Sequence, residues 1–550
     1  MPGGAPIVIT GTADTARVEA PVTVKAYLIC AFAALGGIFF GYDTGYMSGV
    51  LGMKYFIRLY TGLSYPDPSD AAAVSAFHLR ASEQSLIVSI LSAGTFFGAI
   101  LSGDAADFIG RRVTIIVGCL VFIVGCILQT ASTSLGLMVP GRLIGGFGVG
   151  FISAIVILYM SEIAPKKVRG ALIAGNNFCI TIGILLANVV CYTTQDRDDT
   201  GSYRIPIAVQ FLWAIILGTG LFFLPESPRY FVKKGKFERA AKALSAVRGQ
   251  EIDSKYIQDE LAEIIANNEY EKQLIPQTGY FGSWAACFTG SPLRGNSNSR
   301  RTLVGILMQM MQQFTGINFI FYFGVVFFQN LGTINNPFLI QLITSLVNSC
   351  STPISFWMIE RFGRRKILLF GGAGMVISQF IVGIVGVTAG KHGDPAAVRC
   401  MIAFICINIS MFASTWGPAA WVIVGEIFPL PIRARGVGLS TASNWFWNCI
   451  IATITPYLVG KGKGEADLGA KVFFLWGSLC CLTVLFTYFL VPEMKGLSLE
   501  QIDRMLEETT PRKSASWTPH STFASEMGLT EKGVAVTATV EDVHQQLKGV

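Results

Sequence analysis

Three glutamine side chains interrupt an otherwise apolar stretch, LMQMMQQFTGINFIFYFGVVFF, at residues 307–328. On an α-helix, Gln309, Gln312, Gln313 and Gly316 fall at positions i, i+3, i+4 and i+7, so they share one face. A primary amide carries a hydrogen-bond donor and an acceptor, and it has no net charge to desolvate when nothing is bound. This face therefore suits hydrogen bonding to the hydroxyl groups of a neutral molecule. Amides that bond helix to helix are the alternative interpretation, and it fits one glutamine better than the set.

A fourth amide in this stretch, Asn318, lies off the glutamine face on an ideal helix. The sequence TGIN places Gly316 just before it, and a helix that breaks at this glycine would bring Asn318 round to the glutamines. Irregular backbone within a membrane is tolerated where it lines a cavity. We therefore predict a helix break at Gly316.

Two charged residues, Asp43 in FFGYDTGYMSG and Arg142 in GRLIGG, also lie within apolar stretches. A carboxylate in such surroundings is costly unless it is protonated or paired, and Arg142 is the expected partner. Protonation of Asp43 would release Arg142 and bias an equilibrium between two helix arrangements. A fixed structural ion pair is the alternative, and the sequence leaves both open.

The composition of the chain places these side chains in a membrane. Of 550 residues, 52% are hydrophobic and 14% are charged, and the mean hydropathy is +0.52. These values are typical of a polytopic membrane protein. Apolar runs long enough to cross a hydrocarbon layer of ~30 Å recur along the chain. The twelve predicted spans lie near residues 27–50, 84–104, 113–131, 137–159, 171–192, 205–224, 303–330, 337–359, 367–388, 400–424, 437–459 and 471–491.

An even number of spans puts both termini on one side of the membrane. Basic clusters such as Arg229–Lys236 and Arg361–Lys366 lie in alternate loops, which the positive-inside rule assigns to the cytoplasm. Both termini are therefore predicted to be cytoplasmic, and no cleavable signal peptide is visible. The same loop bias, with attraction to the lipid bilayer, explains the net charge of +7 without a nucleic-acid partner.

The distribution of polar segments divides the chain into five parts. The predicted fold is all-α, with twelve transmembrane helices in two six-helix pseudo-repeats and a cytoplasmic helical linker. The ends are rich in polar residues and are expected to be disordered. The expected parts are a disordered N-terminus at 1–22, a bundle at 23–226, the linker at 227–301, a second bundle at 302–492, and a tail at 493–550 that is mostly disordered after about residue 510.

The two halves repeat three landmarks in the same order. DFIGRR matches ERFGRR, SEIAPKKVRG matches GEIFPLPIRARG, and PESPR matches PEMKG. Opposite charges at these helix ends predict ion-pair latches that form when the cytoplasmic side closes. For a single residue, a positive-inside anchor is the alternative. The predicted latch residues are Arg111, Arg112, Glu162, Arg169, Glu226, Arg229, Glu360, Arg364, Arg365, Glu426 and Arg433.

These motifs, together with GRLIGGFGVGF, PESPRYFVKKG, QQFTGIN and PEMKGLSLEQ, resemble the sugar porter family of the major facilitator superfamily, especially fungal hexose transporters. The resemblance covers roughly residues 25 to 505. It implies two six-helix halves around a central substrate site, and transport of a monosaccharide such as glucose by alternating access. It also implies a protein that works as a monomer in the plasma membrane, with no cofactor.

The resemblance further implies roles for individual residues. In this family the QQ and N of QQFTGIN contact sugar, and an indole under the apolar face of the ring is a usual arrangement for carbohydrate. In related symporters the aspartate at position 43 carries the proton, but yeast facilitators keep an aspartate there too. The implied sugar-contacting residues are Gln312, Gln313, Asn318, Asn348, Trp421, Asn444 and Trp445.

One position departs from the family pattern. In RGALIAGNNFCITIG the family usually has glutamine where this chain has Asn177. The asparagine side chain is one methylene shorter, so a direct sugar hydrogen bond would become water-mediated or be lost. Altered affinity or sugar preference is the expected consequence.

Enzymatic and metal chemistry find no support in the sequence. The twelve cysteines form no CxxC pair, and four histidines share no ligand spacing, so no metal site is expected. GGFGVG at 145–150 lies inside a span and is better explained by close helix packing than by nucleotide binding. There is no P-loop, nucleophile elbow or catalytic carboxylate pair, so the protein is not expected to be an enzyme.

Two other functions remain open. Fungal glucose sensors share this fold, and GSYRIPIAVQFLW at 201–213 resembles sensors as well as transporters. Sensors carry long cytoplasmic tails, whereas about 59 residues follow the last span here, which favours a transporter. Transport of a pentose or polyol is the other alternative.

Overall fold

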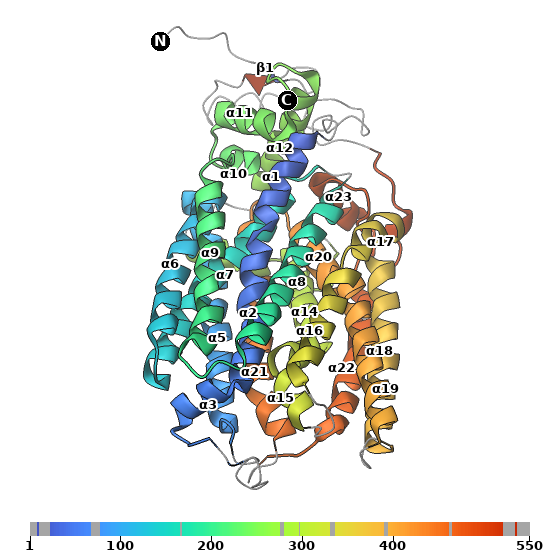
Figure 1. Ribbon diagram of the computed structural model, residues 1–550. Coiled ribbons are helices and arrows are strands. Elements are labelled where there is room, and N and C mark those ends of the chain that lie inside the picture. Colours follow the sequence, from blue (N-terminus) through green and yellow to red (C-terminus); the bar gives the residue numbers. More distant parts are fainter. Residues whose placement is uncertain are drawn as a thin grey trace.

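A computed structural model describes residues 8–9, 23–65, 67, 77–165, 168–274, 280–295, 297–330, 336–389, 394–460, 465–520 and 534–535. These residues form a bundle of long helices with shorter helices gathered at one end (Figure 1). Two short strands, β1 (Val8–Ile9) and β2 (Val534–Ala535), pair antiparallel. Most of the disorder expected at both termini lies outside the described residues.

Helices of the first half correspond to the first six predicted spans. Each is long and apolar enough to cross a membrane. The first span is divided in two, and a short helix, α3 (Lys54–Thr61), follows it. The elements are α1 (Val24–Ala34) with α2 (Gly36–Gly52), α5 (Ala81–Ile109), α6 (Arg111–Ala131), α7 (Leu135–Ile163), α8 (Arg169–Thr194) and α9 (Gly201–Leu221).

The second half repeats this arrangement with more interruptions. In the described residues of both halves together, eleven helices are long and apolar enough to span a membrane. Helix α21 (Arg433–Val459) is also long enough, but it is less apolar than these eleven because it contains more Ser, Thr and Asn. The elements are α14 (Asn298–Phe314) with α15 (Ile317–Asn330), α16 (Pro337–Ser351) with α17 (Ile354–Phe362), α18 (Arg364–Val387), α19 (Pro395–Met411) with the π-helix η3 (Phe412–Trp416) and α20 (Gly417–Glu426), α21 (Arg433–Val459), and α22 (Val472–Leu490).

The predicted break at Gly316 is confirmed. Helix α14 ends at Phe314 and α15 begins at Ile317, and Gly316 between them has a φ of +72°. Glycine is required for this left-handed conformation and for space, because a Cβ atom there would lie 2.5 Å from Cγ of Trp476. The backbone turn therefore rests on a close approach between α14 and α22.

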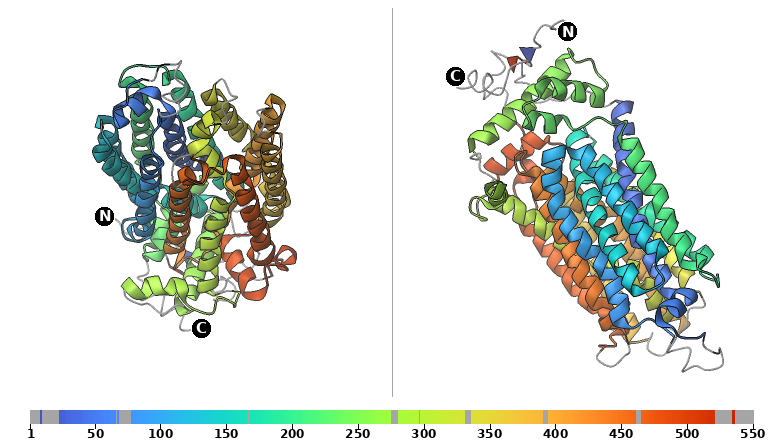
Figure 2. Two further views of the ribbon diagram at one scale, coloured as in Figure 1. Left: turned by 90° about the horizontal axis from the view of Figure 1, so that it is seen from below. Right: turned by 90° about the vertical axis from the view of Figure 1, so that its left-hand side faces the viewer.

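The two halves meet along helices that are distant in sequence. Helix α5 packs along α21, α2 packs against α15, and α8 packs against α16. The views in Figure 2 show the blue to green helices of the first half beside the yellow to red helices of the second. The candidate site lies where α14, α15 and α21 of the second half face α2, α7 and α8 of the first.

A layer of short helices covers one end of the bundle (Figure 1, top). It contains α10 (Pro228–Lys233), α11 (Phe237–Arg248), α12 (Lys255–Leu274), α13 (Tyr280–Ala285) and η1 (Ala286–Phe288), with α23 (Leu499–Glu508) beside them. We call the end of the bundle that this layer covers the linker end, and the opposite end of the bundle the open end.

Residues 510–520, which were expected to be disordered, follow a defined path at the linker end. The hydroxyl of Ser514 accepts a hydrogen bond from the backbone N–H of Glu493 at 2.8 Å, and Arg512 lies over the Tyr488 ring at 5.3 Å. Trp517 packs against the main hydrophobic core. These contacts with α22, with the residues that follow it and with the core fix the position of residues 510–520, which the polar composition of this segment does not predict.

Candidate functional site

Five amide side chains form one hydrogen-bonded network between α14, α15 and α21. Asn444 lies at its centre, since its Nδ2 donates to Oε1 of Gln309 at 2.7 Å and to Oε1 of Gln312 at 2.9 Å. The Oδ1 atom of Asn444 accepts from Nε2 of Gln313 at 2.9 Å. Asn318 completes the network by donating to Oε1 of Gln313 at 2.6 Å. The break at Gly316 does bring Asn318 round to the glutamines.

The network extends to the irregular segment before α20. Nε2 of Gln312 donates to the carbonyl oxygens of Trp416 at 3.1 Å and of Gly417 at 3.0 Å. A Cβ atom on Gly417 would lie 3.1 Å from Nδ2 of Asn177, which belongs to α8 of the first half. The structure therefore brings Asn177 to the edge of the network, from the opposite half of the molecule.

Several buried polar atoms around the network have no hydrogen-bond partner. Leaving such groups unpaired costs free energy, about 1–3 kcal/mol each, so they are the atoms that a polar ligand would satisfy. They are Nε2 of Gln309, Oδ1 of Asn348, Oδ1 of Asn176 and Nε1 of Trp445. Asn348 is 1% exposed on α16, and its side chain is not part of the hydrogen-bonded network.

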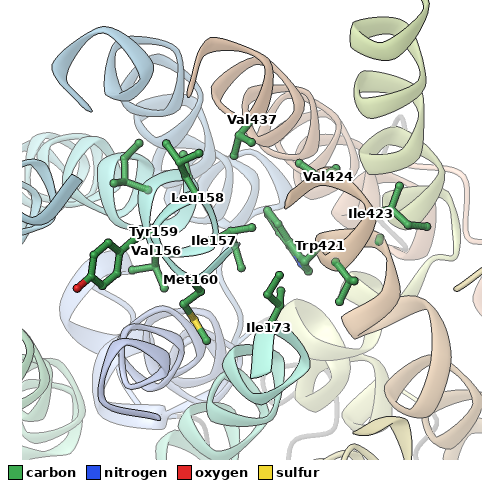
Figure 3. Packing of buried hydrophobic residues seen from close by; sticks show 14 of the residues in the cluster. Val156, Ile157, Leu158, Tyr159, Met160, Ile173, Trp421, Ile423, Val424 and Val437 are labelled. Atoms are coloured by element: carbon green, nitrogen blue, oxygen red, sulfur yellow. The ribbon is translucent and has the colours of Figure 1, made fainter. Parts of the chain in front are cut away.

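Two tryptophans of the second half face the first half. Trp421 on α20 is buried among apolar side chains that include Ile157 and Ile173, and Figure 3 shows its ring reaching toward these residues. Trp445 on α21 is fully buried, and its ring lies edge-on to Phe40 at a centroid distance of 5.1 Å. Both indoles therefore lie at the boundary between the halves, which is where the resemblance predicts the substrate.

A cavity of about 1230 Å³ lies at the open end. Its walls come from both halves and include Gln84, Phe319, Phe323 and Pro456. Phe319 directly follows Asn318, so the cavity begins next to the amide network. None of the predicted site residues is among those that line the cavity. The five amides of the network bond to one another and to the backbone instead.

The opposite side of the site is closed by contact between the halves. A Cβ atom on Gly425 would lie 3.2 Å from Cβ of Ser161 and 3.5 Å from Cγ2 of Ile157. Figure 3 shows the Trp421 ring of α20 next to Ile157 of α7. The structure is therefore open at one end and sealed at the linker end.

Asp43 and Arg142 are both buried between α2 and α7, but the expected direct pair is not formed. Nη1 of Arg142 donates to the hydroxyl of Tyr46 at 2.7 Å, and that hydroxyl donates to Oε1 of Gln129 at 2.8 Å. Both carboxylate oxygens of Asp43 are buried and have no hydrogen-bond partner. The guanidinium of Arg142, which was predicted to pair with Asp43, is thus hydrogen bonded to the phenol of Tyr46 instead.

The predicted latch residues form ion pairs inside each half. In the first half, Nε and Nη2 of Arg111 donate to the two carboxylate oxygens of Glu162 at 3.0 and 2.9 Å. Glu226 accepts from the backbone N–H groups of Arg111 at 3.0 Å and Arg112 at 3.1 Å. The side chain of Arg112 donates to the carbonyl of Leu224 at 2.9 Å.

The second half repeats these contacts at equivalent atoms. Nη2 of Arg364 donates to Oε1 of Glu426 at 3.0 Å, and Nε donates to Oε2 at 3.3 Å. Glu493 accepts from the backbone N–H groups of Arg364 at 2.8 Å and Arg365 at 3.1 Å. Glu493 was not predicted as a latch residue, although aligning PESPR with PEMKG makes it the equivalent of Glu226 in the second half.

Of the predicted latch residues, Glu360 makes a contact that joins the halves at the linker end, and the other contacts there involve residues that were not predicted. Arg435 of α21 reaches α5, where Nε donates to Oδ1 of Asp104 at 2.9 Å and Nη1 to Oδ2 of Asp107 at 3.3 Å. Glu360 of α17 accepts from the backbone N–H of Ala171 at 3.0 Å. Glu360 was predicted as a latch residue, whereas Asp104, Asp107 and Arg435 were missed. Asp107 and Arg435 lie within DFIGRR and GEIFPLPIRARG, but the motifs do not show that these two segments meet.

The tail helix α23 adds two buried ion pairs. Arg229 of α10 pairs with Glu500 at 2.9 Å, and Arg301 of α14 hydrogen bonds to Asp503. Burial raises the pKa of Glu500, but Arg229 more than compensates and holds it at about 2. Burial also raises the pKa of Asp503, which Arg301 only partly offsets.

Arg433 and Arg169, the remaining predicted latch residues, are both buried. Nε of Arg433 donates to the carbonyl of Phe428 at 2.8 Å. Nη2 of Arg169 donates weakly to the carbonyl of Ala164 at 3.4 Å. Each thus bonds the backbone of the loop just before its own helix.

Known proteins resemble this chain over most of its length. The sequence matches the family described as "Sugar (and other) transporter" over residues 29–506. It is 45% identical to the major facilitator-type transporter ecdD of Aspergillus rugulosus, over 91% of this chain and 91% of that protein. It is 39% identical to the probable glucose transporter rco-3 of Neurospora crassa, over 94% of this chain and 86% of that protein. It is also 40% identical to the high glucose sensor RGT2 of Saccharomyces cerevisiae, over 88% of this chain and 61% of the sensor.

The fold matches a solved sugar transporter. The proton:xylose symporter XylE, bound to 6-bromo-6-deoxy-D-glucose, superposes with a TM-score of 0.70 at 25% sequence identity, over 88% of this chain and 99% of XylE. The agreement covers both helical halves. This chain is therefore a multi-pass membrane protein of the sugar transporter family, with the major facilitator fold.

Proposed function

We propose that this protein carries a neutral monosaccharide, glucose or a related hexose, across the membrane by alternating access. The observation that supports this most directly is the network around Asn444, which offers amide donors and acceptors and no net charge. Relatives named as glucose transporters agree with a hexose. A pentose or polyol is the alternative within the same site.

In this proposal the sugar hydroxyls take over hydrogen bonds that the amides now make with one another. Gln309, Gln312, Gln313 and Asn318 form one wall with Asn444, and Nε2 of Gln309 is already free to donate. Trp421 and Trp445 supply an apolar surface for the C–H face of the ring. Binding therefore exchanges polar contacts instead of exposing unpaired groups.

Two amides at the edge of the site have separate roles. Asn348 offers a buried, unpaired Oδ1 from α16. Asn177 reaches the site from the first half. A sugar that contacts Asn177 and the amides of the second half is held by both halves, so its affinity depends on how closely the halves approach each other. An Asn177→Gln variant with unchanged apparent affinity for several hexoses would contradict this role.

We place the linker end and both termini in the cytoplasm, and the protein in the plasma membrane. Basic residues of the linker end support this orientation. The large cavity then opens outward, and the Arg435 contacts with Asp104 and Asp107 hold the inner side shut. Each half moves as a unit, because Arg111 and Arg364 pair within their own halves. The domain boundaries proposed above follow this division.

Proton coupling through Asp43 is a finer proposal. Its two buried oxygens have no hydrogen-bond partner, so a proton would remove an uncompensated charge. Asp43 lies on α2 and Arg142 lies on α7, where its Nη1 atom donates to the hydroxyl of Tyr46. A carrier of this kind needs neither catalysis nor a cofactor, and the fold works as a monomer.

Uptake of labelled glucose in yeast that lacks its own hexose carriers tests the proposal. Uptake that equilibrates with and without a protonophore would establish a facilitator, with Asp43 in a structural role. Accumulation that a protonophore abolishes would establish symport, and Asp43→Asn should then lose accumulation while keeping exchange. No uptake despite surface expression would contradict transport and favour sensing, which the similarity to a glucose sensor makes the second candidate.

A further inference from the structure

Large apolar side chains are exposed on the linker just before α14. Phe281 on α13 is 85% exposed, Phe288 at the end of η1 is 54% exposed, and Leu293 is 87% exposed. Residues 280–294, which we call the anchor segment, thus present three apolar side chains within one short stretch. Such a surface is unfavourable in water and marks a contact with another phase or molecule.

The anchor segment is firmly attached to the membrane-spanning helix that follows it. Nδ2 of Asn298 donates to the carbonyl of Ala286 at 3.0 Å, and the hydroxyl of Thr302 donates to the carbonyl of Cys287 at 2.7 Å. Leu303, the next residue of α14, is 44% exposed on the outer surface of the bundle. The apolar surface of the anchor segment therefore continues the surface that faces lipid.

Cations accompany the apolar side chains. Arg294 is exposed, and Nη1 of Arg300 donates to the backbone carbonyl of Leu293 at 3.0 Å, which holds the guanidinium against the backbone of the anchor segment. Apolar residues next to arginines at the end of a span match the acyl boundary and the anionic headgroups of a cytoplasmic leaflet.

The same segment touches the contact that closes the inner side of the molecule. Nε1 of Trp284 on α13 donates to Oδ2 of Asp104 at 3.1 Å, and the guanidinium of Arg435 lies 5.8 Å from the Trp284 ring. Arg435 also donates to Oδ1 of Asp104. Trp284 thus contacts both partners of the Asp104–Arg435 pair.

We propose that the anchor segment lies in the headgroup region of the cytoplasmic leaflet and, through Trp284, couples that lipid surface to the Asp104–Arg435 pair. Phe281, Phe288 and Leu293 enter the acyl boundary, while Arg294 and Arg300 meet anionic headgroups. Anionic lipid then stabilises the state that is closed at the linker end. The choice of the cytoplasmic leaflet, and with it of anionic lipid, rests on the cytoplasmic orientation proposed above.

Photo-crosslinking tests the membrane contact without any transport assay. Benzoylphenylalanine is placed at Phe288 or Leu293 of the full chain in vesicles of phosphatidylcholine and phosphatidylserine, and lipid adducts are measured by mass spectrometry. Phe97, 57% exposed on α5, is the positive control, and Tyr256, 38% exposed on α12, is the negative control. We expect adducts at 288 and 293 as at 97. Adducts at 97 but not at 288 and 293 would overturn the proposal.

Thermal unfolding in the same vesicles tests the coupling. Phosphatidylserine should raise the Tm of the wild-type protein relative to phosphatidylcholine alone. The rise should be lost in Trp284→Phe, which keeps an apolar ring but lacks the N–H group, and in a Phe288→Ser, Leu293→Ser double variant. It should persist in Tyr256→Ser. An undiminished rise in the first two variants would refute the coupling, whether or not the protein transports sugar.

Discussion

Glu226 and Glu493 occupy equivalent positions in the two halves of the molecule. Each carboxylate accepts hydrogen bonds from two consecutive backbone N–H groups at the start of a helix, α6 for Glu226 and α18 for Glu493. The free N–H groups and the positive end of the helix dipole favour an anion at this position. Glycine precedes each helix, since a Cβ on Gly110 or Gly363 would lie 2.4 Å from the carboxylate.

Replacing either carboxylate by an amide should therefore destabilise its own half. In Glu226→Gln and Glu493→Gln, one side-chain oxygen becomes an NH2 group that cannot accept a backbone hydrogen bond. We expect a loss of about 1–3 kcal/mol for each, measured as a lower Tm in detergent. Glu238→Gln, at an exposed position on α11, is the control and should be neutral. Equal Tm values for all three variants would contradict the capping role.

Asn444 should matter more to sugar affinity than any other single amide. Asn444→Ala removes the partner of Gln309, Gln312 and Gln313 at once, and each lost bond to a ligand or a neighbour is worth about 0.5–1.5 kcal/mol. We expect a KM for hexose uptake raised by roughly tenfold or more. Asn408→Ala, which removes a buried amide of α19 outside the network, is the matched control. A larger KM change in the control would show that the network does not carry binding.

Gly316 should not tolerate a side chain. Gly316→Ala requires an alanine at a φ of +72° and places Cβ against the ring of Trp476. The backbone strain alone costs about 1–2 kcal/mol, and the clash adds to it. Gly175→Ala is the control, because α8 is open at Gly175 and no atom lies within 4 Å of the added Cβ. We expect Gly316→Ala to lower Tm and uptake, and Gly175→Ala to leave both unchanged or slightly raise Tm.

The Glu500–Arg229 pair should be insensitive to pH over the physiological range. The pKa of Glu500 is lowered from its ordinary value of 4.5 to about 2, so the pair contributes fully above pH 4.5 and weakens only as the pH falls toward 2. The shift corresponds to a contribution of about 3 kcal/mol. The difference in Tm between wild type and Glu500→Gln should therefore be constant between about pH 5 and 8. A difference that changes across this interval would mean that Glu500 titrates there and is not paired as described.

Features that depend on neighbouring residues could be predicted from the sequence. Apolar runs give the spans, because crossing a hydrocarbon layer requires a fixed length of apolar helix. The glutamine face at residues 309–313 follows from helical periodicity, and the break at Gly316 follows from a glycine beside polar residues in a span. The internal repeat predicted that Arg111 and Arg364 serve equivalent helix ends, and their contacts with Glu162 and Glu426 are equivalent.

Features that depend on how helices rotate and pack were decided by the tertiary structure alone. Asn444 is the centre of the amide network only because α21 turns it toward Gln309, 135 residues away. Asp43 lacks its expected partner because Tyr46, one turn along α2, reaches Arg142 first. The Asp104–Arg435 pair joins residues 331 positions apart, at a contact between α5 and α21 that no local pattern specifies. Hydrophobicity and periodicity act over a few turns of one helix, whereas these contacts require two helices to meet at one depth and one angle.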